Sequence, residues 1–301
     1  MPAPRPLRPR ALRSRLDALV ASHDRSAHLA ADPVRFVHRY ESPADREVAG
    51  LVGATLAFGH VTAIGASVER VLSVLGPSPA RTVDRLGEAV LRRRLDGFVH
   101  RVYRGPDVAR MLAGAGRVRR QHGSLGAALA ADLAAHPQDL REPLARFADA
   151  LRGDGGGRGL AHLVCDPRAG SACKRLLLYL RWMVRPADGV DVGLWPISPA
   201  RLVMPLDTHV HRIARNLGLT RRATPSWRTA EEITDALRGF DAADPVKYDF
   251  ALCHLGVSRE CPSRPDPAKC ARCVLRPVCR QWRGVAGRPT ANTARAASRP
   301  S

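Results

Sequence analysis

Four cysteines near the C-terminal end of the chain have the spacing of a metal site. Cys261, Cys270, Cys273 and Cys279 lie in CPSRPDPAKCARCVLRPVC, with one Cys-x2-Cys pair and a single cysteine on each side. Four thiolates in one short segment can hold a [4Fe–4S] cluster. Structural zinc is the alternative cofactor, because tetrahedral sulfur coordination also suits zinc, although zinc modules usually supply two close pairs of ligands.

Disulfide bonds are a less favoured use of these cysteines. The chain has seven cysteines, an odd number, and we recognise no secretory signal. Its 301 residues are also enough to bury a sizeable hydrophobic core without covalent cross-links. The four thiols are therefore expected to bind metal.

Lysine is rare in this sequence, and one lysine lies where its amine could react. Lys+Arg total 48, but the lysines are only Lys174, Lys247 and Lys269. An amine can lose its proton and attack carbon, whereas a guanidinium essentially cannot. Lys174 opens the helix of the apolar run Leu176 to Val184, where both the helix dipole and burial should lower its pKa. We expect a free amine there, with Ser171 as N-cap; an ordinary surface lysine is the alternative.

A carboxylate and two histidines follow at the start of a second helix. In PLDTHVHRIARNLGL, Asp207 or Thr208 is expected to begin a helix that ends at Gly218. Asp207 alone would be interpreted as an N-cap. His209 and His211 are two positions apart and so do not share a helix face, which argues against a metal site formed by both.

A third helix leads into the cysteine segment. In DPVKYDFALCHLGV, Asp244 is expected to be the N-cap and Pro245 the first helical residue. Lys247 could contact phosphate or pair with a carboxylate, and the sequence favours neither. The residues expected on the inner side are Val246, Phe250, Cys253 and Val257.

Helical periodicity and turn signals predict an all-α fold. No run alternates long enough to predict a sheet. Further helices are expected at residues 12–21, 45–58, 62–75, 80–94, 106–122, 125–135 and 143–151. A Gly-rich connector is expected at residues 152–159. Four regions are predicted: a basic N-terminal arm with helices that pack on the metal-binding lobe (1–44), a helical barrel (45–204), an Asp-bearing and four-cysteine region (205–286) and a disordered tail (287–301).

The charge of the chain predicts a polyanionic partner. The formal net charge is +20, and nucleic acid is the leading candidate, with RNA not excluded. No stretch is long and apolar enough to span a bilayer, so no membrane partner is expected. We expect a cytoplasmic, nucleoid-associated monomer.

These segments together resemble the helix-hairpin-helix DNA glycosylases, of which endonuclease III is a clustered member. In that superfamily a hairpin ends in a catalytic lysine, a later segment brings a catalytic aspartate, and four cysteines close the domain. The matching residues are Lys174 in SACKRLLLYL, Asp207 in PLDTHVHR and the four cysteines. More closely, SACKR, PLDTHVHR and DPVKYDFALCHLG resemble a bacterial family whose substrate is unassigned.

The resemblance implies a two-lobed helical fold, a [4Fe–4S] cluster and repair of duplex DNA that carries a damaged base. Lys174 would be the nucleophile and Asp207 its partner in a bifunctional enzyme with N-glycosylase and AP lyase activity. The residues expected to contact DNA are Gly170, Ser171, Arg175, His60, Arg264, Lys269, Arg272 and Arg276.

The sequence also departs from the glycosylase pattern. The hairpin RAGSACK keeps Gly170 but lacks the paired glycines of Gly-x-Gly, and 33 positions separate Lys174 from Asp207, more than in endonuclease III. Two other functions therefore remain open. One is a non-catalytic nucleic-acid-binding protein that keeps the fold and the metal site; the other is a zinc-stabilised interaction protein.

Overall fold

The computed structural model describes residues 9–282, and these residues form a helical protein, as predicted. The N-terminal residues 1–8 of the predicted basic arm and the predicted tail at 287–301 lie outside the described residues. The first elements are α1 (Pro9–Ser22), α2 (Arg25–Leu29), η1 (Pro33–Arg39), α3 (Pro43–Thr55), α4 (Val61–Leu75), α5 (Pro79–Arg85), α6 (Glu88–Arg94), β1 (Val99–His100) and β2 (Tyr103–Arg104). The middle elements are α7 (Gly105–His122), α8 (Leu125–Ala135), α9 (Arg141–Arg152), α10 (Arg158–Leu163) and η2 (Pro167–Ala169). The last elements are α11 (Lys174–Val184), η3 (Pro199–Arg201), α12 (Thr208–Leu217), α13 (Trp227–Arg238), α14 (Asp249–Val257), α15 (Pro267–Arg272) and η4 (Arg276–Val278).

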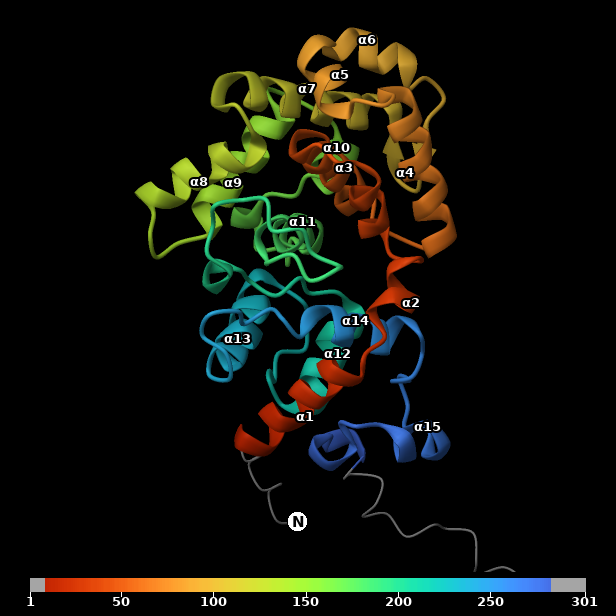
Figure 1. Cartoon of the computed structure of the whole chain (residues 1–301), viewed down its shortest axis with the longest axis vertical. Coiled ribbons are helices and arrows are strands. Elements are labelled where there is room, and N and C mark those ends of the chain that lie inside the picture. Colours follow the sequence, from red (N-terminus) through yellow and green to blue (C-terminus); the bar gives the residue numbers. More distant parts are fainter. Residues whose placement is uncertain (1–8, 283–301) are drawn as a thin grey trace, which may run out of the picture.

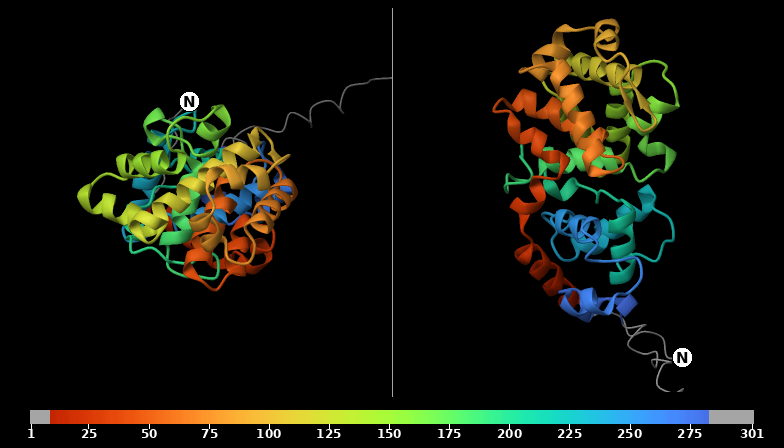
Figure 2. Two further views of the ribbon diagram at one scale, coloured as in Figure 1. Left: turned by 90° about the horizontal axis from the view of Figure 1, so that it is seen from above. Right: turned by 90° about the vertical axis from the view of Figure 1, so that its right-hand side faces the viewer.

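The helices gather into two masses along the long axis of the molecule, with α11 between them (Figure 1). Helices α3 to α10 lie in the upper mass, and α12 to α15 lie in the lower mass. The first helix, α1, also lies in the lower mass, where it packs against η4. Figure 2 shows the same division from the side. The chain therefore brings its N-terminal helix to the same lobe as the four cysteines.

Helix α11 is central because almost every residue of its apolar run is buried. It packs on α3, whose Val48, Leu51 and Val52 are fully buried. Tyr179 of α11 also donates its hydroxyl to the backbone oxygen of Glu47 in α3 at 3.0 Å. A helix enclosed on all sides is a rigid base for the residue that opens it.

Buried ion pairs join α11 to the lower mass. Arg181 contacts Asp191 at 3.1 Å and Asp249 of α14 at 2.5 Å, and these three side chains are almost fully buried. Arg185 contacts Asp244 at 2.9 Å. Because a buried charge is costly without its partner, this network constrains how α11 and α14 lie relative to each other.

Several local predictions differ from the structure. The helix expected at 80–94 divides into α5 and α6 at Gly87. Residues 227–238, for which no helix was expected, form α13, and β1 and β2 form a two-stranded antiparallel ribbon. None of the described helices is long and apolar enough to cross a membrane.

A further local difference concerns the start of α14. Its first helical residue is Asp249, and residues 245–248 form a turn, so Pro245 does not begin the helix. The Asp244 carboxylate accepts hydrogen bonds from Arg185 and does not cap the helix. Val257, expected on the inner side, is 50% exposed.

Candidate functional site

The side chains of Lys174 and Asp207 meet where α11 and α12 begin. Lys174 Nζ lies 3.2 Å from Asp207 Oδ2, and the two side chains are 30% and 14% exposed. Lys174 is the first residue of α11, and Asp207 is the N-cap of α12. The fold therefore brings together, in one partly exposed place, two residues that the sequence separates by 33 positions.

Four donors hold the Asp207 carboxylate. Its Oδ1 accepts the backbone N–H groups of His209 at 2.9 Å and Val210 at 2.8 Å, which is an N-cap interaction. Its Oδ2 faces Lys174 and also accepts the Cys253 thiol at 3.7 Å. Burial acts to raise the pKa of Asp207, but the charge of Lys174 and the Val210 N–H lower it by more, so the pKa lies below its usual range.

Lys174 does not have the lowered pKa that its place at a helix start predicted. Burial is the largest single influence and lowers the pKa, but the charge of Asp207 and its hydrogen bond, together with the influence of Cys253 and Asp249, outweigh it. The net shift is upward, so the expectation of a free amine in the unliganded protein is wrong. At neutral pH the site holds an ammonium paired with a carboxylate.

The hairpin before Lys174 is formed by α10, η2 and the turn 170–173. Gly170 adopts a left-handed conformation, with φ of 80°, and its carbonyl oxygen accepts the N–H of Trp227 at 3.0 Å. Ser171 is exposed but is not the N-cap of α11, contrary to expectation. Cys173 is the N-cap, in a left-handed conformation with φ of 45°, and its N–H donates to Ser171 Oγ at 3.3 Å.

Two further predicted DNA contacts, His60 and Arg175, differ in exposure. His60 is exposed and caps α4, where its Nδ1 accepts the N–H of Thr62 at 3.4 Å. The guanidinium of Arg175 hydrogen-bonds to the backbone oxygen of His162 and lies over the rings of Phe58 and Tyr103, 5.8 and 5.7 Å from their centroids. Arg175 is thus engaged by protein groups in the absence of DNA.

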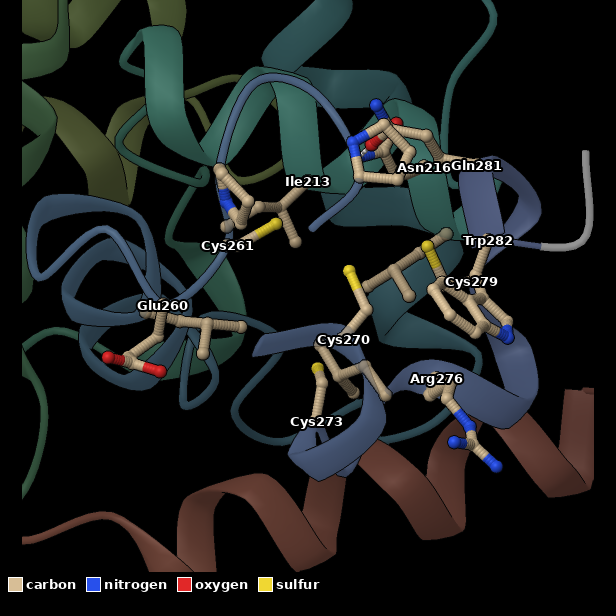
Figure 3. A pocket seen from close by; sticks show the side chains of 15 residues that line it. Ile213, Asn216, Glu260, Cys261, Cys270, Cys273, Arg276, Cys279, Gln281 and Trp282 are labelled. Carbon is tan, nitrogen blue, oxygen red and sulfur yellow. Dashed lines mark hydrogen bonds between the residues drawn. The ribbon is translucent and has the colours of Figure 1, made fainter. Parts of the chain in front are cut away.

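The four cysteines of the predicted metal site line one pocket. Cys261 follows α14, Cys270 lies on α15, Cys273 ends α15 and Cys279 follows η4 (Figure 3). The same pocket is lined by apolar side chains, among them Ile213, Leu217, Leu255 and Trp282. Figure 3 shows the cysteine side chains arranged around this space from separate segments of backbone.

The four cysteines line one pocket, but their side chains are not gathered into a preformed metal site. Among residues 9–282, no three histidine, cysteine or acidic side chains are grouped so that they could hold a metal ion. Burial raises the pKa of both Cys261 and Cys273. Because thiolates are the ligands of a cluster, an iron–sulfur group would supply the positive charge that keeps these sulfurs deprotonated.

The basic residues around the cysteines are unequally exposed. Arg264, Arg272 and Arg276 are exposed, and the guanidinium of Arg276 lies 5.7 Å from the ring centroid of Trp282. Lys269 is partly buried and donates its ammonium to the backbone oxygen of Arg259 at 2.8 Å. The three arginine side chains are therefore accessible to a phosphate, whereas the Lys269 side chain also links its segment to the backbone at Arg259.

The residues that the sequence left undecided have structural partners. Lys247 pairs with Asp241 at 2.8 Å and with Asp17 of α1 at 3.4 Å, so it pairs with carboxylates. His211 is buried and contacts the backbone oxygen of Arg222 at 3.0 Å. His209 packs so closely on Gly256 that a Cβ at that glycine would lie 2.5 Å from the His209 Cβ.

Two residues close to the Lys174–Asp207 pair were not recognised as site residues. Cys253 was expected only to pack inward, yet its thiol donates to Asp207. Asp249 is buried, and burial raises its pKa to about 6 despite the opposing charge of Arg181. The sequence could have indicated that Asp249 is buried, because this carboxylate lies beside an apolar run. Nothing in the sequence indicated that the Cys253 thiol contacts Asp207.

One protein-family comparison gave a match, and it covers the part of the chain that carries the pair. The family model described as "Protein of unknown function (DUF2400)" matches residues 32–258. Comparisons with curated proteins and with solved structures gave no match. The matched stretch includes Lys174, Asp207 and Cys253, but it ends before Cys261. Because it spans most of the sequence, the chain belongs to the DUF2400 family.

Proposed function

We propose that this protein is a DNA N-glycosylase with associated AP lyase activity, acting on a damaged base in duplex DNA. Lys174 is the nucleophile, and Asp207 is the carboxylate that activates it. The observation that carries the proposal is the 3.2 Å contact between Lys174 Nζ and Asp207 Oδ2 at the junction of two helix starts. An amine and a carboxylate within hydrogen-bond reach form the pair that covalent catalysis at a sugar carbon requires.

The ion pair determines the order of events. Lys174 is an ammonium at rest, so it must lose a proton before it can attack. Asp207 is the acceptor at 3.2 Å and takes this proton as Nζ bonds to the sugar C1′. The N-glycosidic bond breaks, and the base leaves with a proton from solvent. Until this proton has been transferred, the negative charge of Asp207 also stabilises positive charge that develops on the sugar.

The covalent intermediate explains the second activity. After the sugar ring opens, Lys174 and C1′ form a Schiff base. The iminium withdraws electrons, so water can take a proton from C2′ as the C3′–O bond breaks and the 3′ phosphate leaves by β-elimination. The products are a nicked strand and, after hydrolysis of the Schiff base, a regenerated Lys174.

DNA binding in this proposal relies on the hairpin and on the cysteine loop. Partly buried Gly170 and exposed Ser171 lie in the turn before Lys174 and would contact backbone phosphate next to the reacting nucleotide. Arg264, Arg272 and Arg276 would contact phosphates farther away. The damaged nucleotide would leave the base stack to reach Lys174.

A [4Fe–4S] cluster would be held by Cys261, Cys270, Cys273 and Cys279. All four line the same pocket, whose wall is otherwise largely apolar. A bound cluster would fix the loop that carries the three exposed arginines. Lys174 forms the bond to the sugar and Asp207 activates it, so the cluster would take no part in the chemistry.

The test is borohydride trapping on duplex oligonucleotides that each carry a single damaged base or an abasic site. Borohydride reduces the Schiff base to a stable amine, so a reacting protein becomes covalently joined to DNA. We expect an adduct with the wild-type protein on at least one lesion and none with Lys174→Ala. The matched control is Lys247→Ala, which removes a lysine that pairs with Asp241 and Asp17. Trapping by Lys174→Ala at the wild-type level would refute the assignment.

The second candidate is a non-catalytic nucleic-acid-binding protein of the same fold. Its support is that Lys174 is protonated and paired, as in a structural salt bridge, and that Arg175 is held by protein groups. It predicts salt-sensitive DNA binding with no adduct on any lesion or abasic site. The same panel therefore separates the two functions.

A further inference from the structure

An open hollow lies between the end of α6, the β1–β2 ribbon and the start of α7. Its volume is about 460 Å³, within the range of about 300–1,000 Å³ that is typical of small-molecule sites. We name it the ribbon hollow. The lining residues that bear on its use are Arg92, Arg93, Asp96, Phe98, Val99 and Arg104. These residues belong neither to the Lys174 site nor to the cysteine pocket.

The ribbon hollow carries more positive than negative charge. Arg92, Arg93 and Arg104 are exposed. The acidic residue that lines the hollow with them is Asp96. Arg92 lies 3.9 Å from Glu88 in a surface i,i+4 pair, which contributes little. Within the described residues, neither Arg93 nor Arg104 pairs with a carboxylate, and Arg104 donates to two backbone oxygens instead. The hollow therefore attracts an anion.

A second hollow, of about 410 Å³, shows the opposite use of arginine. Arg110 contacts Glu88 there at 3.1 Å, and Arg152 pairs with Asp149. Arg117 donates to a backbone oxygen at 3.3 Å. The arginines of this second hollow are engaged by the fold, whereas Arg93 and Arg104 of the ribbon hollow are available to a ligand.

The β1–β2 ribbon places an apolar side chain beside a cation. Val99 and Arg104 are directly opposite each other in the antiparallel register, so their side chains lie on the same face. Val99 is 55% exposed, and the buried Phe98 also lines the hollow. A ligand that joins a phosphate to an apolar ring would use both features. A bare inorganic anion would leave the valine exposed.

The other face of the ribbon is anchored, so the wall of the hollow is preformed. His100 hydrogen-bonds through Nδ1 to Ser67 Oγ of α4 at 2.8 Å. The hydroxyl of Tyr103 hydrogen-bonds to Nδ1 of His162 in α10 at 2.9 Å. Both ribbon residues are buried. A wall that is already in place does not have to be ordered when a ligand binds.

The ribbon also links the hollow to the segment that carries Lys174. Tyr103 directly precedes Arg104 of the hollow. The guanidinium of Arg175, which directly follows Lys174, lies 5.7 Å from the ring centroid of Tyr103. The hollow and the reacting segment are therefore separated by one anchored element.

We propose that the ribbon hollow is a binding subsite for a nucleoside phosphate that belongs to a nucleic-acid strand. Arg93 and Arg104 bind phosphate, and the base lies against Val99. A strand is favoured over a free mononucleotide because the hollow is open and the ribbon links it to Lys174. The identification of the strand as duplex DNA rests on the proposed function, whereas the nucleoside-phosphate chemistry of the hollow does not.

Two matched substitutions on α6 test the phosphate contact. Arg93 lines the hollow, whereas the next residue, Arg94, is also exposed but is not a lining residue. Loss of one phosphate contact lowers the slope of log affinity against log salt by about 1, and affinity near physiological salt by about three- to tenfold. Arg93→Gln should show this loss for fluorescent duplex DNA without a lesion, and Arg94→Gln should stay near wild type.

Thermal melting shows whether both variants fold as wild type does. A loss of DNA affinity for Arg94→Gln as large as that for Arg93→Gln would overturn the phosphate contact. No loss for Arg93→Gln would overturn it as well.

Photocross-linking tests whether a base enters the hollow. Duplexes that carry 5-iodouracil at successive positions are irradiated with the full-length wild-type protein and digested with trypsin. We expect a cross-link in LDGFVHR (95–101), which contains Phe98 and Val99. Absence of this cross-link would overturn the subsite. An excess of deoxyribonucleoside monophosphate should leave the cross-link intact, and its loss would overturn the assignment to a strand.

These measurements do not depend on chemistry at Lys174. If borohydride trapping gives no adduct on any lesion, the proposed function fails, but the affinity loss of Arg93→Gln and the cross-link in residues 95–101 would still establish the subsite. If trapping succeeds and both of these results are absent, the subsite alone is overturned.

Discussion

The Lys174–Asp207 pair and the four-cysteine pocket differ in what holds them. Asp207 has four donors from the protein, and Lys174 sits on a helix that is buried and fastened by ion pairs. The pocket gathers its sulfurs from a loop, one short helix and a 3₁₀ turn, and the four cysteine side chains are only partly buried. The first site is complete without a ligand, whereas the second is expected to be completed by one.

The two sites also differ in whether the family match includes them. The DUF2400 match covers the pair and stops before the first cysteine of the pocket. In the proposed function, the cysteine site would add stability and phosphate contacts, whereas the Lys174–Asp207 pair would perform the chemistry. Changes at the pair are therefore expected to affect the rate of adduct formation, whereas changes at the cysteine pocket are expected to affect metal content and DNA affinity.

Asp207→Asn should have the largest effect. The amide oxygen keeps the N-cap of α12, but it cannot accept the Lys174 proton. The single-turnover rate of adduct formation at saturating DNA should fall by about 10²- to 10⁴-fold, the range for loss of a positioned base. Melting temperature and DNA affinity should stay near wild type. A wild-type rate would mean that Asp207 only caps the helix.

Arg181→Met should have the next largest effect, on stability. Arg181 is 2% exposed and pairs with Asp191 and Asp249, so removing it strands two buried carboxylates. The free energy of unfolding from urea denaturation should fall by about 3–5 kcal/mol. The matched control is Arg238→Met, whose exposed pair with Asp235 should contribute far less. An equal loss of unfolding free energy in the two variants would contradict the conclusion that burial makes the Arg181 ion pairs important for stability.

Cys270→Ala should affect metal content and DNA affinity more than chemistry. The protein should lose its brown colour and its iron, and DNA binding should weaken because the loop with the three exposed arginines is no longer fixed. The adduct rate at saturating DNA should stay close to wild type. Cys165→Ala, outside the pocket, should keep the iron. Zinc in place of iron in the wild-type protein would contradict the cluster.

His23 should have the smallest effect, and it depends on pH. Burial, His28 and His254 lower its pKa from 6.5 to about 4. Between these values the unfolded chain binds a proton that the folded protein does not, so stability falls as pH decreases from 6.5 to 4. His23→Gln should reduce the fall in melting temperature between pH 7 and pH 5. An unchanged pH dependence would assign that fall to other groups.

The sequence predicted most helices because their caps and apolar stripes lie close together in the chain. The helix at 125–135 has the predicted limits, and α4 begins one residue before its predicted start. Helix α13 was missed although its signals are present: Ser226 caps it, and Ile233 and Leu237 lie on its buried face. Asp244 could not be assigned correctly because its partner, Arg185, is distant in sequence.

The candidate site was predictable only in part, for the same reason. The sequence identified Lys174 and Asp207 as reactive types at helix starts, and the family resemblance gave the reason to expect them together. The pKa of Lys174 was predicted with the wrong sign, because helix position and burial were considered without the charge 3.2 Å away. The thiol contact of Cys253 with Asp207 depends on tertiary packing and has no local signal.

The most direct test of the account is to locate the trapped DNA on the protein. The wild-type protein is trapped with borohydride on its best lesion, and the adduct is digested with nuclease and protease and analysed by mass spectrometry. With only three lysines in the chain, the alternatives are few. The account predicts that the sugar remnant is bound to Lys174. A remnant on Lys247, Lys269 or the terminal amine would contradict it.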